Sequence, residues 1–458
     1  MQARSSIPRH VPRARDRAAV SAIGRYAARL ALVVLAAILA GGCMLRDLQQ
    51  QVRLMDRTCL LEGRVERGEN EGRSVVVALE GGPGGSEEPL PRPVDFTLPD
   101  GQGGYAFALA PGSYVVLAFI DHDDDLELDA REPARQANGG RLIECGAGGQ
   151  VETEAIVLED GDRVAGRTGL SAPGSRHLVE DALESAVSLG QLTAFGEVVP
   201  LADPRFDPER ARDSLWRPLD FLRGGHAGVY LARPYVESRT PVLFIHGING
   251  SPRVLEPLIR HLDGERFQPL YFYYPSGLRI GQTAWHLERI MRELEHRFGI
   301  DRFHVVAHSM GGLVARAWLL RRGQPGDRAR VGAFVSLSTP WEGYPSARQG
   351  VAHSPVVVPV WRDMAAGSDF LAGLFAEDAP PSSQPPHHLL FSFRQSGWIP
   401  SATNDGVAAL ASMLPVAVQR QAASVFGVDA GHVEILADQT AQARVESILL
   451  QSEAGSSR

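Results

Sequence analysis

The stretch VVAHSMGG, residues 305–312, is a run of small and apolar residues that ends in a serine closely followed by two glycines. The apolar run is typical of a buried strand, and the following LVARAWLLRR is typical of a helix. A strand, a tight turn with serine at its apex and a helix are the context of a nucleophile elbow. Ala307 occupies the first small position of the motif, where glycine is commonest. We therefore predict that Ser309 is a nucleophile.

A serine hydroxyl needs a base, and the base needs an orienting carboxylate. Behind such an elbow the acid and then the histidine follow the serine along the chain, each after a later strand. Asp405 lies in a polar turn after LLFSFR, and His432 lies between ASVFGV and a final helical pattern. Asp429 is the rival acid, but it is only three residues from His432, so we expect it to shape that loop. We predict Ser309, Asp405 and His432 as the catalytic set; the alternative for His432 is a surface histidine.

Acyl chemistry also needs two backbone donors for the charge that develops on the attacked oxygen. One is expected from the amide of Met310, at the start of the elbow helix. The segment IHGINGSP, residues 245–252, ends the first strand of this part of the chain, and its HG pair resembles the oxyanion loop of lipases. By that resemblance the second donor is the amide of Ile248, and His246 braces the loop.

The segments HGING, AHSMGG, LSTPWEG, NDGV and GHVEIL occur in the order found in bacterial lipases and inositol-deacylase-like α/β-hydrolases. The resemblance covers roughly residues 240 to 450. It implies an α/β-hydrolase fold with a mostly parallel sheet. It also implies a lipase-like or esterase-like serine hydrolase that cleaves lipid or other acyl esters through an acyl-enzyme, without a cofactor for catalysis. Two alternatives stay open, an acyltransferase with the same three residues and a non-catalytic, surface-binding lipoprotein.

From Pro241 onward, apolar runs alternate with amphipathic stretches, which predicts an α/β catalytic domain over residues 240–455. The segment between AFVSLST and LLFSFR, about residues 341–387, is expected to form a cap over the catalytic set. Six apolar cap residues either line an acyl pocket or form the core of the cap itself: Trp341, Tyr344, Trp361, Phe370, Leu371 and Phe375.

Residues 58–160 read as short β segments separated by glycine and proline, which predicts a small all-β sandwich. Within them GGYAFALAPGSYVVLAF, residues 103–119, resembles transthyretin-like and carboxypeptidase-regulatory-like modules. Residues 161–239 are expected to link and brace the two halves. Cys59 and Cys145 form either a disulfide, which an exported compartment permits, or two buried thiols.

The loop DHDDDLELDARE, residues 121–132, has acids at the positions from which an EF-hand loop offers oxygen ligands. The predicted ligands are Asp121, Asp123, Asp125, Asp129 and Glu132, together with the backbone carbonyl of Glu127. Leu126 departs from the pattern, because glycine normally makes the sharp turn at that position. The resemblance is to calcium-binding turns set into β domains, and the alternative is a solvated acidic turn.

The first thirty residues carry seven arginines and one aspartate, and the apolar run LALVVLAAILAGGC follows at residues 30–43. This pattern predicts a secretory signal over residues 1–42. Its end, LAGGC, resembles a bacterial lipoprotein box with Cys43 as the lipidated residue, followed by a tether over residues 43–57; the alternative is an ordinary secretory signal. Met44 after the cysteine favours the outer membrane of a bacterial cell envelope. Removal of the signal changes the net charge from −8 to −14, which disfavours nucleic acid as a partner and leaves lipid to provide the membrane anchor.

Overall fold

The structure is a computed structural model, and the chain divides into two compact units, residues 1–50 and 51–458. The described residues are 45–53, 57–68, 72–81, 92–99, 103–123, 126–164, 194–322, 329–375, 384–394 and 404–456. Of the first unit these include only residues 45–50, which belong to a helix over residues 45–53. The predicted signal and Cys43 lie outside the described residues. Among the helices that are described, none has both the length and the apolar character needed to cross a bilayer.

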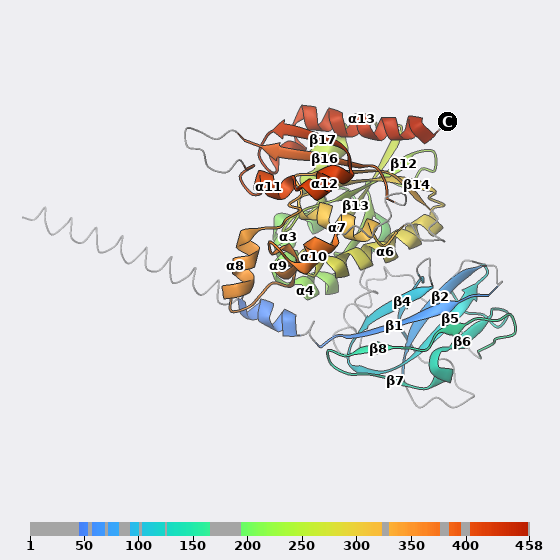
Figure 1. The fold of residues 1–458 in the computed structure, drawn as a ribbon. Coiled ribbons are helices and arrows are strands. Elements are labelled where there is room, and N and C mark those ends of the chain that lie inside the picture. The colour runs from blue at the N-terminus through green and yellow to red at the C-terminus, as the bar shows by residue number, and fades with distance from the viewer. Residues whose placement is uncertain are drawn as a thin grey trace, which may run out of the picture. The chain divides into compact units, whose positions relative to one another are not determined.

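An eight-stranded sheet organises the C-terminal part of the second unit (Figure 1). Its strands are β10 (Ala194–Val198), β11 (Gly228–Leu231), β12 (Thr240–Ile245), β13 (Phe267–Tyr273), β14 (Arg302–His308), β15 (Arg330–Leu337), β16 (His387–Phe393) and β17 (Ala422–Asp429). Within the sheet the strands lie side by side in the order β10-β11-β13-β12-β14-β15-β16-β17, so β12 and β13 exchange places relative to the chain. The last six are parallel to one another, and β11 pairs antiparallel with β13. The predicted α/β architecture with a mostly parallel sheet is confirmed.

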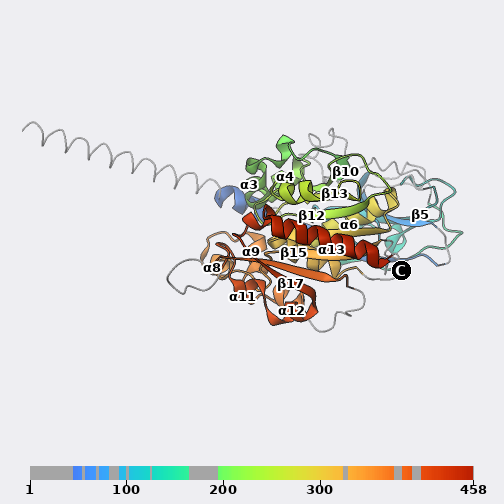
Figure 2. The ribbon, with the colours of Figure 1, turned by 90° about the horizontal axis from the view of Figure 1, so that it is seen from above.

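Helices cover both faces of this sheet, which explains why the central strands are apolar throughout (Figures 1 and 2). On one face lie α5 (Glu256–His261) and α13 (Gln439–Ser456), which contact each other. On the other face α6 (Ile280–Arg297) packs against α7 (Met310–Leu319). The buried residues of α6 recur every three or four positions, among them Ala284, Leu287, Met291 and Leu294, as in a helix with one buried face.

The sheet begins before residue 240, because β10 and β11 come from the segment that the sequence predicted to be a linker. The run GVYL of β11 reads as a strand in the sequence, whereas the signal of β10 is weak. β10 is a short edge strand whose Gly196 has a φ of +66° and whose Glu197 and Val198 are exposed. The helical pattern between these strands forms two helices, α3 (Pro208–Trp216) and α4 (Pro218–Arg223), because proline favours the first turn of a helix over its interior. The stretch VEDALESAVSLGQL, residues 179–192, whose sequence also favours a helix, lies outside the described residues.

Short helices fill the connections after β15 and β16. The predicted cap contains α8 (Pro345–His353), α9 (Pro359–Met364) and α10 (Asp369–Gly373), and α11 (Leu410–Met413) and α12 (Val416–Gln421) lie between β16 and β17. Single 3-10 turns occur at η3 (Pro204–Phe206), η4 (Pro252–Leu255) and η6 (Glu434–Leu436). The Asp405 turn lies between β16 and α11, and the His432 loop lies between β17 and η6.

The N-terminal β region, residues 57–164, contains two sheets in which most strands are antiparallel. One has the order β4-β1-β8, with β9 also paired to β1, and the other has the order β3-β2-β5-β6, with β7 also paired to β5. The strands are β1 (Cys59–Glu66), β2 (Arg73–Glu80), β3 (Pro93–Thr97), β4 (Gly104–Leu109), β5 (Gly112–Asp121), β6 (Ala134–Gln136), β7 (Ile143–Cys145), β8 (Gln150–Glu152) and β9 (Ile156–Val157); η1 (Ala137–Gly140) follows β6. A disulfide between Cys59 and Cys145 joins β1 to β7 and therefore links the two sheets.

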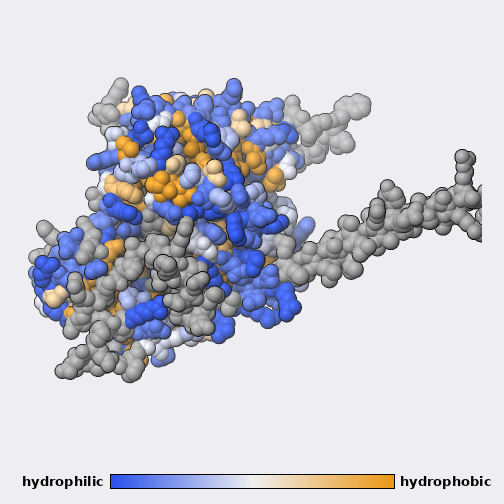
Figure 3. Space-filling view, turned by 180° about the vertical axis from the view of Figure 1, so that it is seen from behind, coloured by the Kyte–Doolittle hydropathy of each residue, from blue (hydrophilic) through white to orange (hydrophobic). Residues whose placement is uncertain are grey.

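Apolar side chains also reach the surface. Figure 3 shows hydrophobic residues gathered among hydrophilic ones on the upper part of the face seen from behind. The large apolar residues that are exposed are Leu142, Val157, Val198, Val236, Val407, Val416, Val425 and Val433. Two of them adjoin predicted catalytic residues, since Val407 lies two residues beyond Asp405 and Val433 directly follows His432.

Candidate active site

Ser309 stands at a sharp turn between β14 and α7. Its φ of 54° and ψ of −130° are rare for a residue other than glycine. The two glycines that follow are required by close packing. A Cβ on Gly311 would lie 2.4 Å from the carbonyl oxygen of Ile245, and one on Gly312 would lie 2.0 Å from Thr339 Oγ1. The start of α7 therefore lies directly against the ends of β12 and β15, as a nucleophile elbow requires.

The three residues predicted as the catalytic set lie together in a hydrogen-bonded series. His432 Nε2 is 2.8 Å from Ser309 Oγ, and His432 Nδ1 is 2.6 Å from Asp405 Oδ2. All three side chains are buried. Because a carboxylate only accepts hydrogen bonds, Nδ1 carries the proton and Nε2 is left to accept one from the serine hydroxyl. This arrangement fits a general base that is oriented by an acid.

Asp405 is held as a carboxylate by a full set of donors. Its Oδ1 accepts hydrogen bonds from the amides of Val407 and Ala408, at 3.0 and 2.7 Å, and its Oδ2 accepts one from Ser392 Oγ at 2.6 Å. Burial acts to raise the pKa of Asp405, but the hydrogen bonds from His432, Ser392 and the Ala408 amide outweigh it and lower the pKa to about 2. Asp405 therefore stays ionised at neutral pH.

His308 positions the loop that carries His432, a role that the sequence did not reveal. Its Nε2 donates a hydrogen bond to the carbonyl oxygen of His432 at 2.8 Å. Burial lowers the pKa of His308 to about 3, so its ring is neutral. The His432 amide in turn donates to the carbonyl oxygen of Asp405 at 3.0 Å. The backbone of His432 is thus fixed on both sides.

The loop after β12 lies against Ser309. A Cβ on Gly247 would be only 2.8 Å from Ser309 Cβ. The amides of Asn249 and Gly250 donate hydrogen bonds to Ser276 Oγ and to the carbonyl oxygen of Gly247. Within the described part of the chain, the amides of Ile248 and Met310 donate none. The two amides predicted as oxyanion donors therefore have no partner within this part of the chain.

His246 braces this loop. Its ring stacks on Tyr274 with 4.3 Å between the ring centroids, and its Nδ1 donates to the carbonyl oxygen of Gly247 at 2.7 Å. The Tyr274 hydroxyl donates to the carbonyl oxygen of His246 at 2.6 Å. Burial lowers the pKa of His246 to about 4, which keeps the ring neutral.

One of the six predicted cap residues, Tyr344, faces the nucleophile. Its side chain interacts with that of Ser309, and burial raises the pKa of its phenol, so the hydroxyl keeps its proton. The hydroxyl oxygen is buried and has no regular hydrogen-bond partner among the described residues. The backbone of Tyr344 is fixed, because its amide donates to the carbonyl oxygen of Met364 at 2.8 Å. Tyr344 therefore places a protonated hydroxyl close to Ser309.

Four of the other cap residues pack within the protein. Trp341 and Leu371 are buried, and the Trp341 ring contacts Phe375 at 5.2 Å between centroids. Trp361 packs edge-on against Trp216 at 6.1 Å. Phe370 is partly exposed in a surface groove. Among these six residues Tyr344 interacts with Ser309, and a lining of an acyl pocket by the others stays a prediction.

The rival acid Asp429 and three other histidines of this part of the chain are exposed or engaged elsewhere. Asp429 is exposed at the end of β17. His387 Nε2 bonds Ser336 Oγ at 2.8 Å, and His388 Nδ1 bonds Ser424 Oγ at 2.8 Å. His353 is exposed at the end of α8.

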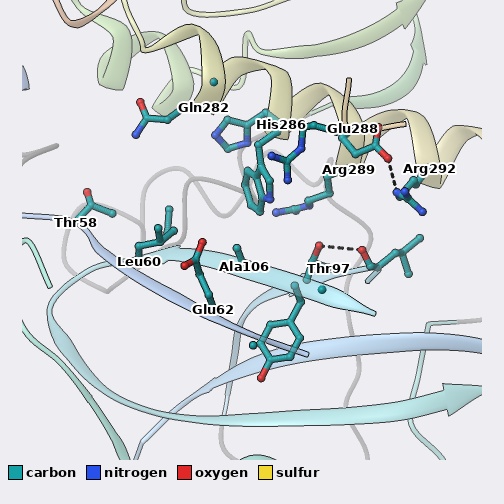
Figure 4. Close-up of a pocket in the computed structure, with 18 of the residues that line it drawn as sticks. Thr58, Leu60, Glu62, Thr97, Ala106, Gln282, His286, Glu288, Arg289 and Arg292 are labelled. Carbon is teal, nitrogen blue, oxygen red and sulfur yellow. Dashed lines mark hydrogen bonds and ion pairs between the residues drawn. The ribbon is translucent and has the colours of Figure 1, made fainter. Parts of the chain in front are cut away.

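A separate cavity of about 480 Å³ includes none of Ser309, Asp405 and His432 in its lining. Figure 4 shows Leu60 and Glu62 of β1 on one side of it and residues of α6 on the other. Beside it Arg289 pairs with Asp95 at 3.3 Å, and both side chains are buried. This cavity belongs to the packing between the N-terminal β region and α6.

The acidic loop gathers three of its predicted ligands. Asp121, Asp123 and Glu132 each offer an oxygen, and these atoms lie within 4.8 Å of one another. Asp129 pairs instead with Arg131. The Glu127 side chain is not part of the cluster, its backbone carbonyl stays a predicted ligand, and Asp125 lies outside the described residues.

Comparison with known proteins agrees with this topology. Residues 240–358 match the family model described as the alpha/beta hydrolase fold. The C-terminal part of the chain has the α/β-hydrolase fold. Among curated proteins, none matches the sequence.

Solved structures resemble the chain over about half its length. The mature lipase BlEst2 of Bacillus licheniformis is 15% identical with a TM-score of 0.38, and the match covers 48% of this chain and 97% of that one. The lin2722 product of Listeria innocua is 16% identical with a TM-score of 0.36, covering 46% and 94%. A putative aryl esterase from Burkholderia cenocepacia is 13% identical with a TM-score of 0.34, covering 49% and 94%. Likeness at this level gives no information about substrates.

Proposed function

We propose that the protein is a serine hydrolase that cleaves acyl esters, including lipid esters. The observation that carries the proposal is the buried series from Ser309 through His432 to Asp405, placed at an elbow whose φ is positive. Such a series is the arrangement by which a weak hydroxyl nucleophile becomes reactive.

Each step of the reaction has a residue to perform it. Ser309 Oγ attacks the ester carbonyl while His432 Nε2 takes its proton, and the imidazolium that forms is stabilised by Asp405. The amides of Ile248 and Met310 donate to the oxygen that becomes negative. His432 then gives its proton to the leaving alcohol, and water enters by the reverse sequence to release the acid and free Ser309.

The surroundings favour an apolar acyl group. Val407 and Val433 adjoin Asp405 and His432 in the chain, and their exposed fractions are 58% and 52%. We infer that both valines border the way to Ser309, where a hydrocarbon chain can lose contact with water. Esters with longer acyl chains are therefore the expected substrates.

The test uses the Ser309→Ala variant and a fluorophosphonate probe that labels activated serines. We expect the unmodified protein to be labelled and to hydrolyse p-nitrophenyl esters of graded chain length, and the variant to do neither while keeping its melting temperature. Ser238→Ala, at an exposed turn before β12, is the matched control and should keep both activities. Labelling that persists in Ser309→Ala, or no ester hydrolysis by the unmodified protein at any chain length, would overturn the proposal.

A further inference from the structure

The turn between β5 and β6 gathers negative charge in a buried place. Asp121 is the last residue of β5, and it and Glu132 are almost fully buried, with exposed fractions of 1% and 3%. Asp123 is exposed, so it opens the cluster to solvent. Carboxylates so close together repel one another unless a cation lies among them.

A second observation points to a missing partner. The Asp121 side chain has no exposed surface, and within the described part of the chain its Oδ1 has no hydrogen-bond partner. Its Oδ2 is occupied, since it accepts hydrogen bonds from Arg73 at 3.1 Å and from the Leu126 amide at 3.2 Å. A buried carboxylate oxygen without a partner is costly, and protein structures rarely leave one.

We propose that Asp121, Asp123 and Glu132 bind a calcium ion. Calcium holds its oxygen ligands at about 2.3–2.6 Å, so ligands on opposite sides of the ion are roughly 4.6–5.2 Å apart. The spread of at most 4.8 Å among the three oxygens fits within that range. The hard carboxylate oxygens are the ligand type that calcium prefers, and Asp121 Oδ1 is the atom that gains a partner.

The backbone of the turn is compatible with this assignment. Leu126 has a φ of 63°, so it adopts the left-handed conformation although it is not glycine. Leu128, two residues later, is fully buried against the Val75 and Phe119 side chains of the β core. The turn is therefore anchored to the sheet through its apolar residue, and an ion at Asp121 would fix its acidic side.

The experiment is calcium titration of the whole chain after treatment with EDTA, followed by isothermal calorimetry and by thermal unfolding. We expect saturable binding of calcium and a higher melting temperature when it is bound. Asp123→Asn is the main variant, because Asp123 is exposed and its replacement leaves the fold intact. The variant should bind calcium about tenfold more weakly or worse, since affinity depends on the number of charged ligands.

The matched control is Asp160→Asn, which removes an exposed carboxylate from the same β region and should bind calcium as the unmodified protein does. Equal binding by Asp123→Asn and Asp160→Asn would overturn the proposal, because the ion would then bind elsewhere. The absence of any heat or thermal shift at millimolar calcium would overturn it as well, and would leave a solvated acidic turn.

Discussion

Tyr344 adds a side-chain donor to the two backbone donors beside Ser309. Its hydroxyl is protonated, buried and without a regular partner among the described residues, so it is free to donate to an oxygen of the tetrahedral intermediate. We expect Tyr344→Phe to lower kcat by about a hundredfold and to change KM little, because losing one such donor acts mainly on the transition state. Steady-state kinetics with a p-nitrophenyl ester measure both constants. The control is Tyr235→Phe, which alters a tyrosine stacked on Phe298 with 4.7 Å between the ring centroids and should leave kcat and KM unchanged. Equal kcat values for Tyr344→Phe and Tyr235→Phe would contradict a role for Tyr344 in catalysis.

The low pKa of Asp405 predicts how stability depends on pH. Its pKa of about 2 in the folded protein is below the ordinary value of 3.8, so ionised Asp405 favours the folded state above pH 4. That contribution, about 2 kcal/mol, is lost as the pH falls from 4 to 2. In Asp405→Asn the free energy of unfolding should fall less between pH 4 and pH 2 than in the unmodified protein. Asp429→Asn, at an exposed position, should show the same fall as the unmodified protein. Urea unfolding at several pH values measures the difference, and parallel pH curves for the unmodified protein and Asp405→Asn would count against it.

At the scale of residues, the sequence predicted which side chains lie together in the candidate site but not which residues support them. The proximity of Ser309, Asp405 and His432 was predictable because each follows an apolar strand in a fixed chain order. His308 and Ser392 support these residues through hydrogen bonds to His432 and Asp405. Local sequence patterns do not reveal such contacts, because they join separate parts of the chain. The His308 bond to the carbonyl of His432, for instance, spans 124 positions. Tyr344 was predictable as an apolar cap residue, but its hydroxyl facing Ser309 depends on how the cap folds back.

At the scale of elements, the elbow depends on how closely α7 approaches β12. A Cβ on Gly311 would meet two backbone oxygens, those of Ile245 and His246, at 2.4 and 2.5 Å. Backbone cannot rotate away as a side chain can, so Gly311→Ala should push α7 off the sheet and cost about 1–3 kcal/mol. The same shift moves the Met310 amide, so ester hydrolysis should fall as well. Gly281→Ala, in α6, meets nothing within 4 Å and should be neutral or slightly stabilising. Similar melting temperatures for the two variants would show that the close approach is not required.

The elements that the sequence predicted best are those buried on both faces. β12 and β14 have continuous apolar interiors because helices cover the sheet on both sides. β10 escaped detection because an edge strand with exposed residues and a glycine at positive φ lacks that pattern. β5, in the N-terminal β region, is also apolar along its length. Val116, Ala118 and Ile120 face one apolar cluster, and the residues between them face another. Its continuous apolar run fits a strand between two layers.

Attachment to a membrane concerns the whole molecule. Without residues 1–42 the chain carries a net charge of −14, so an anionic bilayer repels it, and only an apolar anchor can hold it there. Attachment through an apolar anchor does not depend on the salt concentration, whereas salt screens attachment through charge. If Cys43 is lipidated, as the LAGGC segment predicts, the protein should stay in the membrane fraction through a high-salt wash and leave it in detergent. Cys43→Ser should then appear in the soluble fraction, with the same specific ester hydrolysis as the unmodified protein. Equal release of both proteins without detergent would instead favour an ordinary secretory signal.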